Sequence, residues 1–185
     1  MISKSPEGKM EETILWKKND PGPMCLDPWR RNLYVVETFK INNEMQDKRN
    51  IEGSWNEKNS EDIGLWSTMM ACNLDNKNCG IIYGSNNSVV HSVSVALREG
   101  RLLFCTKFWD LERGLLMTSF LDGTEMRVIR RKMNWCGSVA VDEAKRRVYW
   151  TDLVLNTVES VTWEGENHHH VNGHQNVSDD LMVLF

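Results

Sequence analysis

The sequence contains no long apolar run and no surplus of basic residues. Among its 185 residues, no apolar stretch approaches the roughly 18 residues of a membrane span, and residues 1–7 lack an apolar stretch of the signal-peptide type. Its 22 Lys and Arg residues face 26 Asp and Glu residues, which gives a formal net charge of −4. This balance argues against general nucleic-acid binding, because such proteins usually carry a strong basic surplus.

The motifs that usually mark an active site are also missing. There is no Gly-Lys-Ser/Thr phosphate loop, no His-Glu-x-x-His pair and no nucleophile elbow. The five cysteines are too few for a small disulfide-built protein and too irregularly spaced for a zinc ribbon. We therefore expect a binding protein rather than an enzyme, with no cofactor and no metal. Hydrophobic residues make up 41% of the chain, which is enough for a packed core.

One pattern of strand-like segments recurs along the chain. Residues 139–142 are apolar or small and end in an acidic residue, a charged link follows, and residues 148–152 are rich in β-forming side chains. Similar segments occur at the same spacing in two earlier stretches, 24–27 with 33–37 and 93–96 with 102–106, although the 93–96 segment ends in Ala96 and not in an acidic residue. Such a regular recurrence indicates one structural unit repeated several times.

A turn signature keeps the same register as these segments. An acidic residue followed by Gly or Asn recurs, and 19 positions separate both Gly8 from Asp27 and Gly123 from Asp142. Such pairs accept a positive φ at low cost and are typical of hairpin turns, whereas helical periodicity is absent. Each unit is therefore interpreted as four short strands in about 40–50 residues, which is typical of a β-propeller blade.

The third copy carries a recognisable motif. Residues 148–152, Val-Tyr-Trp-Thr-Asp, together with Val-Ala-Val-Asp at 139–142 and Trp-Glu-Gly at 163–165, resemble the YWTD repeat, the class B repeat of the LDL-receptor family. The earlier copies depart from this motif and read Tyr-Val-Val-Glu at 34–37 and Leu-Phe-Cys-Thr at 103–106. The resemblance implies a six-bladed propeller of the kind usually flanked by EGF-like modules.

The repeat register and the resemblance together predict an all-β chain that forms part of a six-bladed YWTD-type β-propeller. We expect about three full blades and partial blades at both ends. Residues 1–22 are expected to end a preceding blade, and residues 172–185 to begin a following one. The full blades are expected at 23–83, with a long polar loop insertion at 38–63, at 90–130 and at 137–171.

The motif residues are expected to carry structure rather than chemistry. By the resemblance, Tyr149 and Trp150 pack within and between blades, and Thr151 and Asp152 satisfy hydrogen-bond donors at a strand end. Buried polar groups need such partners, at a cost of about 1–3 kcal/mol when they are left unpaired. The residues interpreted as structural are Asp27, Tyr34, Asp142, Tyr149, Trp150, Thr151 and Asp152.

Two cysteines lie symmetrically about a predicted turn. Cys72 and Cys79 flank six residues, so they either form a disulfide across the hairpin, in an oxidising compartment, or remain thiols. Cys25 and Cys105 occupy strand positions and are interpreted as buried free thiols. Cys136 is left to pair with a cysteine outside this chain.

The two rims of the expected disc differ in composition. One rim carries Arg-rich hairpin links near the acidic turn residues Asp75, Asp122 and Glu164, and is interpreted as self-neutralising, with a docking patch as the alternative. The opposite rim carries aromatic residues beside charges, which is typical of binding hot spots. Its candidate ligand-binding residues are Phe108, Trp109, Asn134 and Trp135, with core packing as the competing interpretation.

Three consecutive histidines, His168, His169 and His170, precede His174. Neighbours on a strand point to opposite faces, and no Cys or carboxylate partner has the spacing of a metal ligand, so no metal site is expected. The run is interpreted as solvated. A pH-sensing role is the alternative, because imidazole titrates between roughly pH 5 and 8.

The resemblance implies a function in protein binding. We expect an extracellular propeller segment of an LDL-receptor-related endocytic receptor for lipoprotein or yolk protein, on the outer face of the plasma membrane or in endosomes. The parent receptor supplies flanking EGF-like modules and the membrane anchor, so the chain is expected to be an internal fragment or the product of an incomplete gene model. N-glycosylation sequons at Asn86 and Asn176 are compatible with export. The alternatives are a Wnt co-receptor-like signalling propeller for a Wnt-pathway ligand, an adhesive matrix propeller and a calcium-dependent lactonase.

Overall fold

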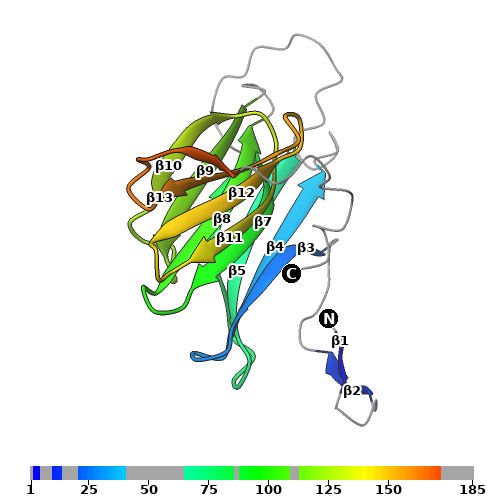
Figure 1. Cartoon of the computed structure of the whole chain (residues 1–185). Helices are drawn as coiled ribbons and strands as arrows, with labels where there is room; N and C mark the ends of the chain where they lie inside the picture. The colour runs from blue at the N-terminus through cyan, green and yellow to red at the C-terminus, as the bar shows by residue number, and fades with distance from the viewer. Residues whose placement is uncertain are drawn as a thin grey trace.

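The computed structural model describes residues 2–4, 10–13, 21–40, 65–85, 88–108 and 113–171. All regular secondary structure in these residues is β-strand (Figure 1). No helix in this part of the chain has the length and apolarity needed to cross a bilayer. The predicted all-β fold class is therefore confirmed.

Most of the described strands form three four-stranded antiparallel sheets, and within each sheet every strand pairs with the next one along the chain. The first sheet contains β3 (Pro21–Asp27), β4 (Asn32–Lys40), β5 (Leu65–Asn73) and β6 (Cys79–Ser85). The second contains β7 (Ser88–Ala96), β8 (Arg101–Phe108), β9 (Arg113–Phe120) and β10 (Arg127–Met133). The third contains β11 (Cys136–Asp142), β12 (Arg147–Asp152), β13 (Thr157–Thr162) and β14 (His169–Val171).

Two further short strands, β1 (Ile2–Lys4) and β2 (Met10–Thr13), pair with each other as an antiparallel ribbon. Two of the expected segments lie outside the described residues. These are the beginning of a following blade at 172–185 and the greater part of the loop expected at 38–63, of which residues 38–40 belong to β4.

The charged links fold as tight turns because one residue in each adopts a left-handed conformation. That residue is Arg31 in the first sheet (φ 53°), Gly100 in the second (φ 62°) and Arg146 in the third (φ 51°). A left-handed residue at the end of a short turn gives the twist that antiparallel strands need. The acidic residue before the turn adds a hydrogen bond, since Asp142 Oδ1 accepts from the backbone N–H of Lys145 at 3.0 Å.

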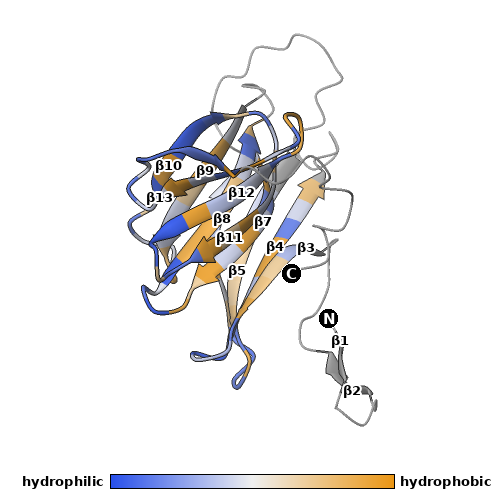
Figure 2. Ribbon diagram, in the orientation of Figure 1, coloured by the Kyte–Doolittle hydropathy of each residue, from blue (hydrophilic) through white to orange (hydrophobic). Residues whose placement is uncertain are grey.

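The hydrophobic core of the described residues consists of two layers, one on each side of the second sheet. Figure 2 shows that strands in the middle of the molecule, such as β5 and β8, are rich in apolar residues. Successive residues of a strand point to opposite faces, so the apolar run in β8 serves both layers. Leu102 and Phe104 pack toward the first sheet, where they join Tyr34, Val36 and Met69. Leu103 and Cys105 pack toward the third sheet, with Val139, Val148, Trp150 and Val161.

The innermost strands of the three sheets are neighbours, as in the blades around a propeller axis. Strand β7 contacts both β3 and β11. The Ser92 hydroxyl in β7 accepts a hydrogen bond of 3.0 Å from the backbone N–H of Val139 in β11. Three antiparallel sheets stacked face to face, with their first strands gathered together, form a partial β-propeller.

Two glycine turns contact the outer strand of the preceding sheet. Gly123 in the β9–β10 turn has φ 85° and lies against the backbone of Ile82 in β6. Gly165 in the β13–β14 turn has φ 90° and lies against Ile129 in β10. The acidic-Gly signature of the sequence therefore marks turns that also hold neighbouring blades together.

Candidate functional site

Aromatic and apolar side chains gather at one end of the sheets, which we call the aromatic rim. It is formed by the end of β8, the β10–β11 link and the β12–β13 turn. Its described residues are Lys107, Phe108, Asn134, Trp135, Leu153, Val154 and Leu155. Trp109, which the sequence placed with them, lies outside the described residues.

Trp135 is the central side chain of the aromatic rim. It is partly buried, and the ammonium nitrogen of Lys107 lies 4.1 Å from its ring centroid. The imidazole of His91 contacts the same indole, with the two ring centroids 5.4 Å apart. The Trp135 ring therefore packs on the second sheet and still reaches the surface, and its role in ligand binding stays a prediction.

His91 is held in its neutral form by this environment. Burial lowers its pKa, and the positive charge of Lys107 lowers it further. The Nε2 atom of His91 is buried and has no hydrogen-bond partner among the described residues. A second proton on this ring would place a positive charge in a buried site, and an N–H at Nε2 would have no hydrogen-bond acceptor there.

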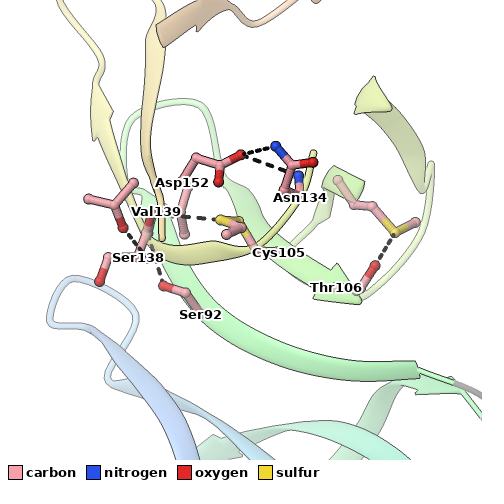
Figure 3. The surroundings of a disulfide bond; sticks show 10 residues. Ser92, Cys105, Thr106, Asn134, Ser138, Val139 and Asp152 are labelled. Carbon is pink, nitrogen blue, oxygen red and sulfur yellow. Dashed lines mark hydrogen bonds between the residues drawn. A yellow bond between two sulfur atoms is a disulfide. The ribbon is translucent and has the colours of Figure 1, made fainter. Parts of the chain in front are cut away.

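Asp152 fixes the backbone before Trp135, at Asn134, and after Leu153, at Val154 and Leu155. Its Oδ1 accepts hydrogen bonds from the backbone N–H groups of Val154, at 3.0 Å, and Leu155, at 3.1 Å. Its Oδ2 accepts two more from Asn134, one from the backbone and one from the side-chain amide, both 3.2 Å long (Figure 3). The carboxylate is buried, and these bonds give it a structural role.

The β12–β13 turn exposes three consecutive apolar residues that the sequence interpretation passed over. The exposed fractions are 53% for Leu153, 64% for Val154 and 53% for Leu155. The turn is anchored to the rest of the aromatic rim, because the Leu153 N–H donates to the Trp135 carbonyl at 2.8 Å. An apolar triplet in a turn, where polar residues are usual, is the sequence signal that marks this feature.

A disulfide between Cys105 in β8 and Cys136 in β11 lies directly beneath the aromatic rim (Figure 3). It crosslinks the second and third sheets, and the two Cα atoms are 5.9 Å apart. The prediction that Cys105 is a free thiol and that Cys136 pairs outside the chain is therefore wrong. The two residues are 31 positions apart in sequence and meet only because their sheets pack face to face.

The other cysteines follow the hairpin geometry. Cys72 and Cys79 are directly opposed on β5 and β6 and form a disulfide. Cys25 carries a free thiol. Burial, and to a smaller extent the Asp27 carboxylate, raises the pKa of this thiol to about 12, so it is unreactive at neutral pH.

The opposite end of the sheets, which we call the arginine rim, pairs its own charges. Arg31 bonds to Asp75 at 2.6 Å, and Arg146 bonds to both Glu99 at 3.1 Å and Glu164 at 3.2 Å. These groups are largely exposed, so each pair contributes little to stability. The ion pairs agree with the interpretation of a self-neutralising rim.

The remaining motif residues lie in structural positions. Asp27 is fully buried and accepts backbone hydrogen bonds of 3.0 Å from Trp29 and Arg30. Tyr34 and Trp150 are buried in the two core layers. Thr151 Oγ1 accepts from the Ser138 N–H at 2.9 Å, and Tyr149 is partly buried. Of the two sequons, both acceptors, Asn86 and Asn176, lie outside the described residues.

A second cluster of polar side chains lies on the third sheet, away from the aromatic rim. Glu159 in β13 is directly opposite His170 in β14, and His168 is two residues before His170 on the same side. His168 Nε2 lies 2.6 Å from Glu159 Oε2, and His170 Nδ1 lies 3.7 Å from Glu159 Oε1. Sequence spacing pointed to no carboxylate ligand for the histidine run, whereas strand pairing brings Glu159 beside it.

Comparison with known proteins gives a likeness in fold. Neither the protein-family models nor the curated proteins include a match. A chain in the crystal structure of a nidogen/laminin complex is similar, with a TM-score of 0.60 and 11% identity over 84% of this chain and 49% of that one. Oligogalacturonate lyase in complex with manganese is similar, with a TM-score of 0.61 and 11% identity over 92% of this chain and 40% of that one. The chain therefore spans half or less of these structures and shares their fold.

Proposed function

We propose that the chain is a protein-binding segment of an extracellular β-propeller and that the aromatic rim is its binding surface. The observation that carries this proposal is the difference between the two rims. Leu153, Val154 and Leu155 expose apolar side chains beside the Trp135–Lys107 pair, whereas the charges of the arginine rim are paired with one another. Contiguous exposed apolar residues around an aromatic anchor are typical of interaction sites.

The parent protein in this proposal is an endocytic receptor of the LDL-receptor type. The Tyr-Trp-Thr-Asp motif at 149–152, which lies in β12, supports this assignment. The two disulfides fit an oxidising compartment, such as the outer face of the plasma membrane or the endosome. The ligands would be lipoprotein or yolk protein, and flanking EGF-like modules and a single membrane anchor would belong to the parent receptor.

An adhesive matrix propeller is a second candidate. The fold likeness to a chain of the nidogen/laminin complex supports it. Both candidates use the propeller as a binding module rather than as an enzyme, and both place the ligand on a rim of the disc. They differ in the partner, which makes the choice of probe decisive.

The test is binding of the immobilised chain to four purified probes: low-density lipoprotein, yolk lipoprotein, laminin and a Wnt-pathway inhibitor protein. Val154→Asp places a charge in the exposed turn of the aromatic rim. Trp29→Asp is the matched control, because Trp29 is an equally exposed apolar residue, at 63%, on the arginine rim. Biolayer interferometry gives the affinity of each variant for each probe.

We expect a lipoprotein probe to bind and Val154→Asp to weaken that binding at least tenfold, as a central contact residue does, with Trp29→Asp unchanged. Binding to laminin alone would favour the matrix candidate, and binding to the Wnt-pathway inhibitor alone would favour a signalling receptor. Loss of binding in Trp29→Asp but not in Val154→Asp would overturn the assignment of the aromatic rim.

A further inference from the structure

We propose that Glu159, His168 and His170 form a binding site for Zn²⁺ or a similar late first-row divalent cation. One donor atom from each of the three side chains lies within 4.8 Å of the other two. Two imidazole nitrogens and one carboxylate oxygen are a donor set that Zn²⁺ prefers, whereas Ca²⁺ and Mg²⁺ prefer all-oxygen sets. Three protein ligands leave a fourth position for water or an external ligand.

Strand pairing places the three donors on one face of the third sheet. Glu159 is the direct cross-strand partner of His170, and His168, just before β14, contacts the His170 ring with centroids 5.1 Å apart. A tetrahedral Zn²⁺ with bonds of about 2.0–2.1 Å needs donor atoms roughly 3.3 Å apart. His168 Nε2 lies 2.6 Å from Glu159 Oε2 and His170 Nδ1 lies 3.7 Å from Glu159 Oε1, so each imidazole is within about 1 Å of this separation from one of the two carboxylate oxygens.

Neighbouring side chains hold two of the ligands in place. The His168 ring stacks on the Trp150 indole, with centroids 5.8 Å apart and planes 16° from parallel. The Thr157 hydroxyl donates to Glu159 Oε1 at 3.0 Å, and the Glu159 side chain is buried. Such supporting contacts orient metal ligands and raise metal affinity. His170 forms the solvent side of the site, since 59% of its side chain is exposed.

One neighbour opposes the ion. Arg130 Nη2 in β10 lies 3.5 Å from His168 Nδ1, and a guanidinium can only donate to that nitrogen. An ion bound to His168 Nε2 requires the proton of a neutral ring to be on Nδ1. The Nδ1–H group would then face the N–H groups of Arg130, and two donors cannot form a hydrogen bond. Removing the guanidinium should therefore strengthen metal binding, which separates coordination from a simple His168–Glu159 hydrogen bond.

The experiment uses the full chain produced without a histidine tag. Isothermal titration with Zn²⁺ gives stoichiometry and affinity, and the visible absorption of added Co²⁺ reports tetrahedral coordination. The test variants are Glu159→Gln, which keeps the shape of a buried side chain, and His170→Ala, which alters an exposed one. His169→Ala is the matched control, because His169 is in the same strand and points to the other face. Arg130→Gln is the fourth variant.

We expect one Zn²⁺ per chain, with affinity at least tenfold weaker in Glu159→Gln and His170→Ala, unchanged in His169→Ala and stronger in Arg130→Gln. Circular dichroism of each variant shows that the sheets are intact. Absence of Zn²⁺ binding would overturn the proposal. Equal affinity in all variants, or loss of affinity in His169→Ala, would also overturn it, because the ion would then be held by the exposed histidine run.

Discussion

At the scale of single residues, Asp152 shows how a motif carboxylate shapes the aromatic rim. Its two oxygens accept four hydrogen bonds, two from the Val154–Leu155 backbone and two from Asn134. Asp152→Asn keeps one acceptor but turns an amide NH₂ group toward the two Asn134 donors. We expect the free energy of unfolding to fall by about 2–3 kcal/mol, measured by urea denaturation.

Asp142→Asn is the control for this prediction. Asp142 lies at the end of β11, just before the first hairpin turn of the third sheet, and is partly exposed. It accepts one backbone hydrogen bond, from the N–H of Lys145. Asparagine keeps that acceptor, and the exposed Lys145 pair contributes little, so the loss should stay below about 1 kcal/mol. Equal losses in the two variants would contradict a special role for the Asp152 contacts.

His91 makes stability depend on pH. Because its pKa in the folded chain lies below the ordinary value of 6.5, the unfolded chain binds the proton first as the pH falls. The contribution of neutral His91 is therefore fully present above about pH 6.5 and decreases below it. We expect the free energy of unfolding of the native chain to fall between about pH 7.5 and 5.5, with His91 responsible for part of the slope.

The variant His91→Gln isolates this part of the slope. Urea denaturation at about pH 7.5 and pH 5.5 gives the difference in free energy of unfolding between the two pH values for each variant. A packing loss that is the same at both pH values cancels in this difference. The difference should shrink in His91→Gln and remain in His169→Gln, since His169 is exposed on β14. An unchanged difference in His91→Gln would show that burial against Trp135 and Lys107 does not govern the titration.

At the scale of elements, the glycine turns connect one blade to the next. Gly165 has φ 90°, and a Cβ at this position would lie 2.5 Å from the Ile129 carbonyl oxygen. Gly165→Ala therefore combines an unfavourable backbone conformation with a clash between sheets, and we expect a loss of roughly 3 kcal/mol. Gly84→Ala is the control, because nothing lies within 4 Å of a Cβ there. A comparable loss in both variants would contradict the inter-sheet explanation.

The elements themselves could be predicted because strand and turn signals are local. The apolar or small residues of 139–142, the β-forming residues of 148–152 and the acidic-Gly pairs at Asp122 and Glu164 depend only on neighbours in sequence. The hairpin disulfide Cys72–Cys79 is equally local, since its residues are seven apart. These signals were enough for an all-β propeller chain, which the sheets confirm.

Contacts between elements could not be predicted in the same way. Cys105 and Cys136 meet across two sheets, and neither residue has a local pattern that identifies the other. Glu159 reaches His170 through the register of β13 with β14, which depends on where the intervening turn begins. The exposure of Leu153–Leu155 depends on the turn that these residues form between β12 and β13. The candidate site therefore needed the three-dimensional arrangement, although its residue types were visible.

At the scale of the whole molecule, stability depends on two separate apolar layers rather than one continuous core. Each layer joins the second sheet to one neighbouring sheet. Cooperative unfolding of all three sheets therefore also depends on polar and covalent contacts between them. Backbone-to-hydroxyl bonds do this at Ser67 with Val90 and at Ser92 with Val139. The Cys105–Cys136 disulfide adds a covalent link between the second and third sheets.

The two disulfides should consequently differ in their effect on stability. Loss of loop-closure entropy in the unfolded chain grows with the number of residues enclosed. For separations of 31 residues in Cys105–Cys136 and 7 residues in Cys72–Cys79, the expected contributions are about 4 and about 2 kcal/mol. We expect the double variant Cys105→Ala/Cys136→Ala to lose more free energy of unfolding than Cys72→Ala/Cys79→Ala, measured by urea denaturation without reductant. The reverse order would show that the inter-sheet disulfide links sheets that the packed layers already hold in place.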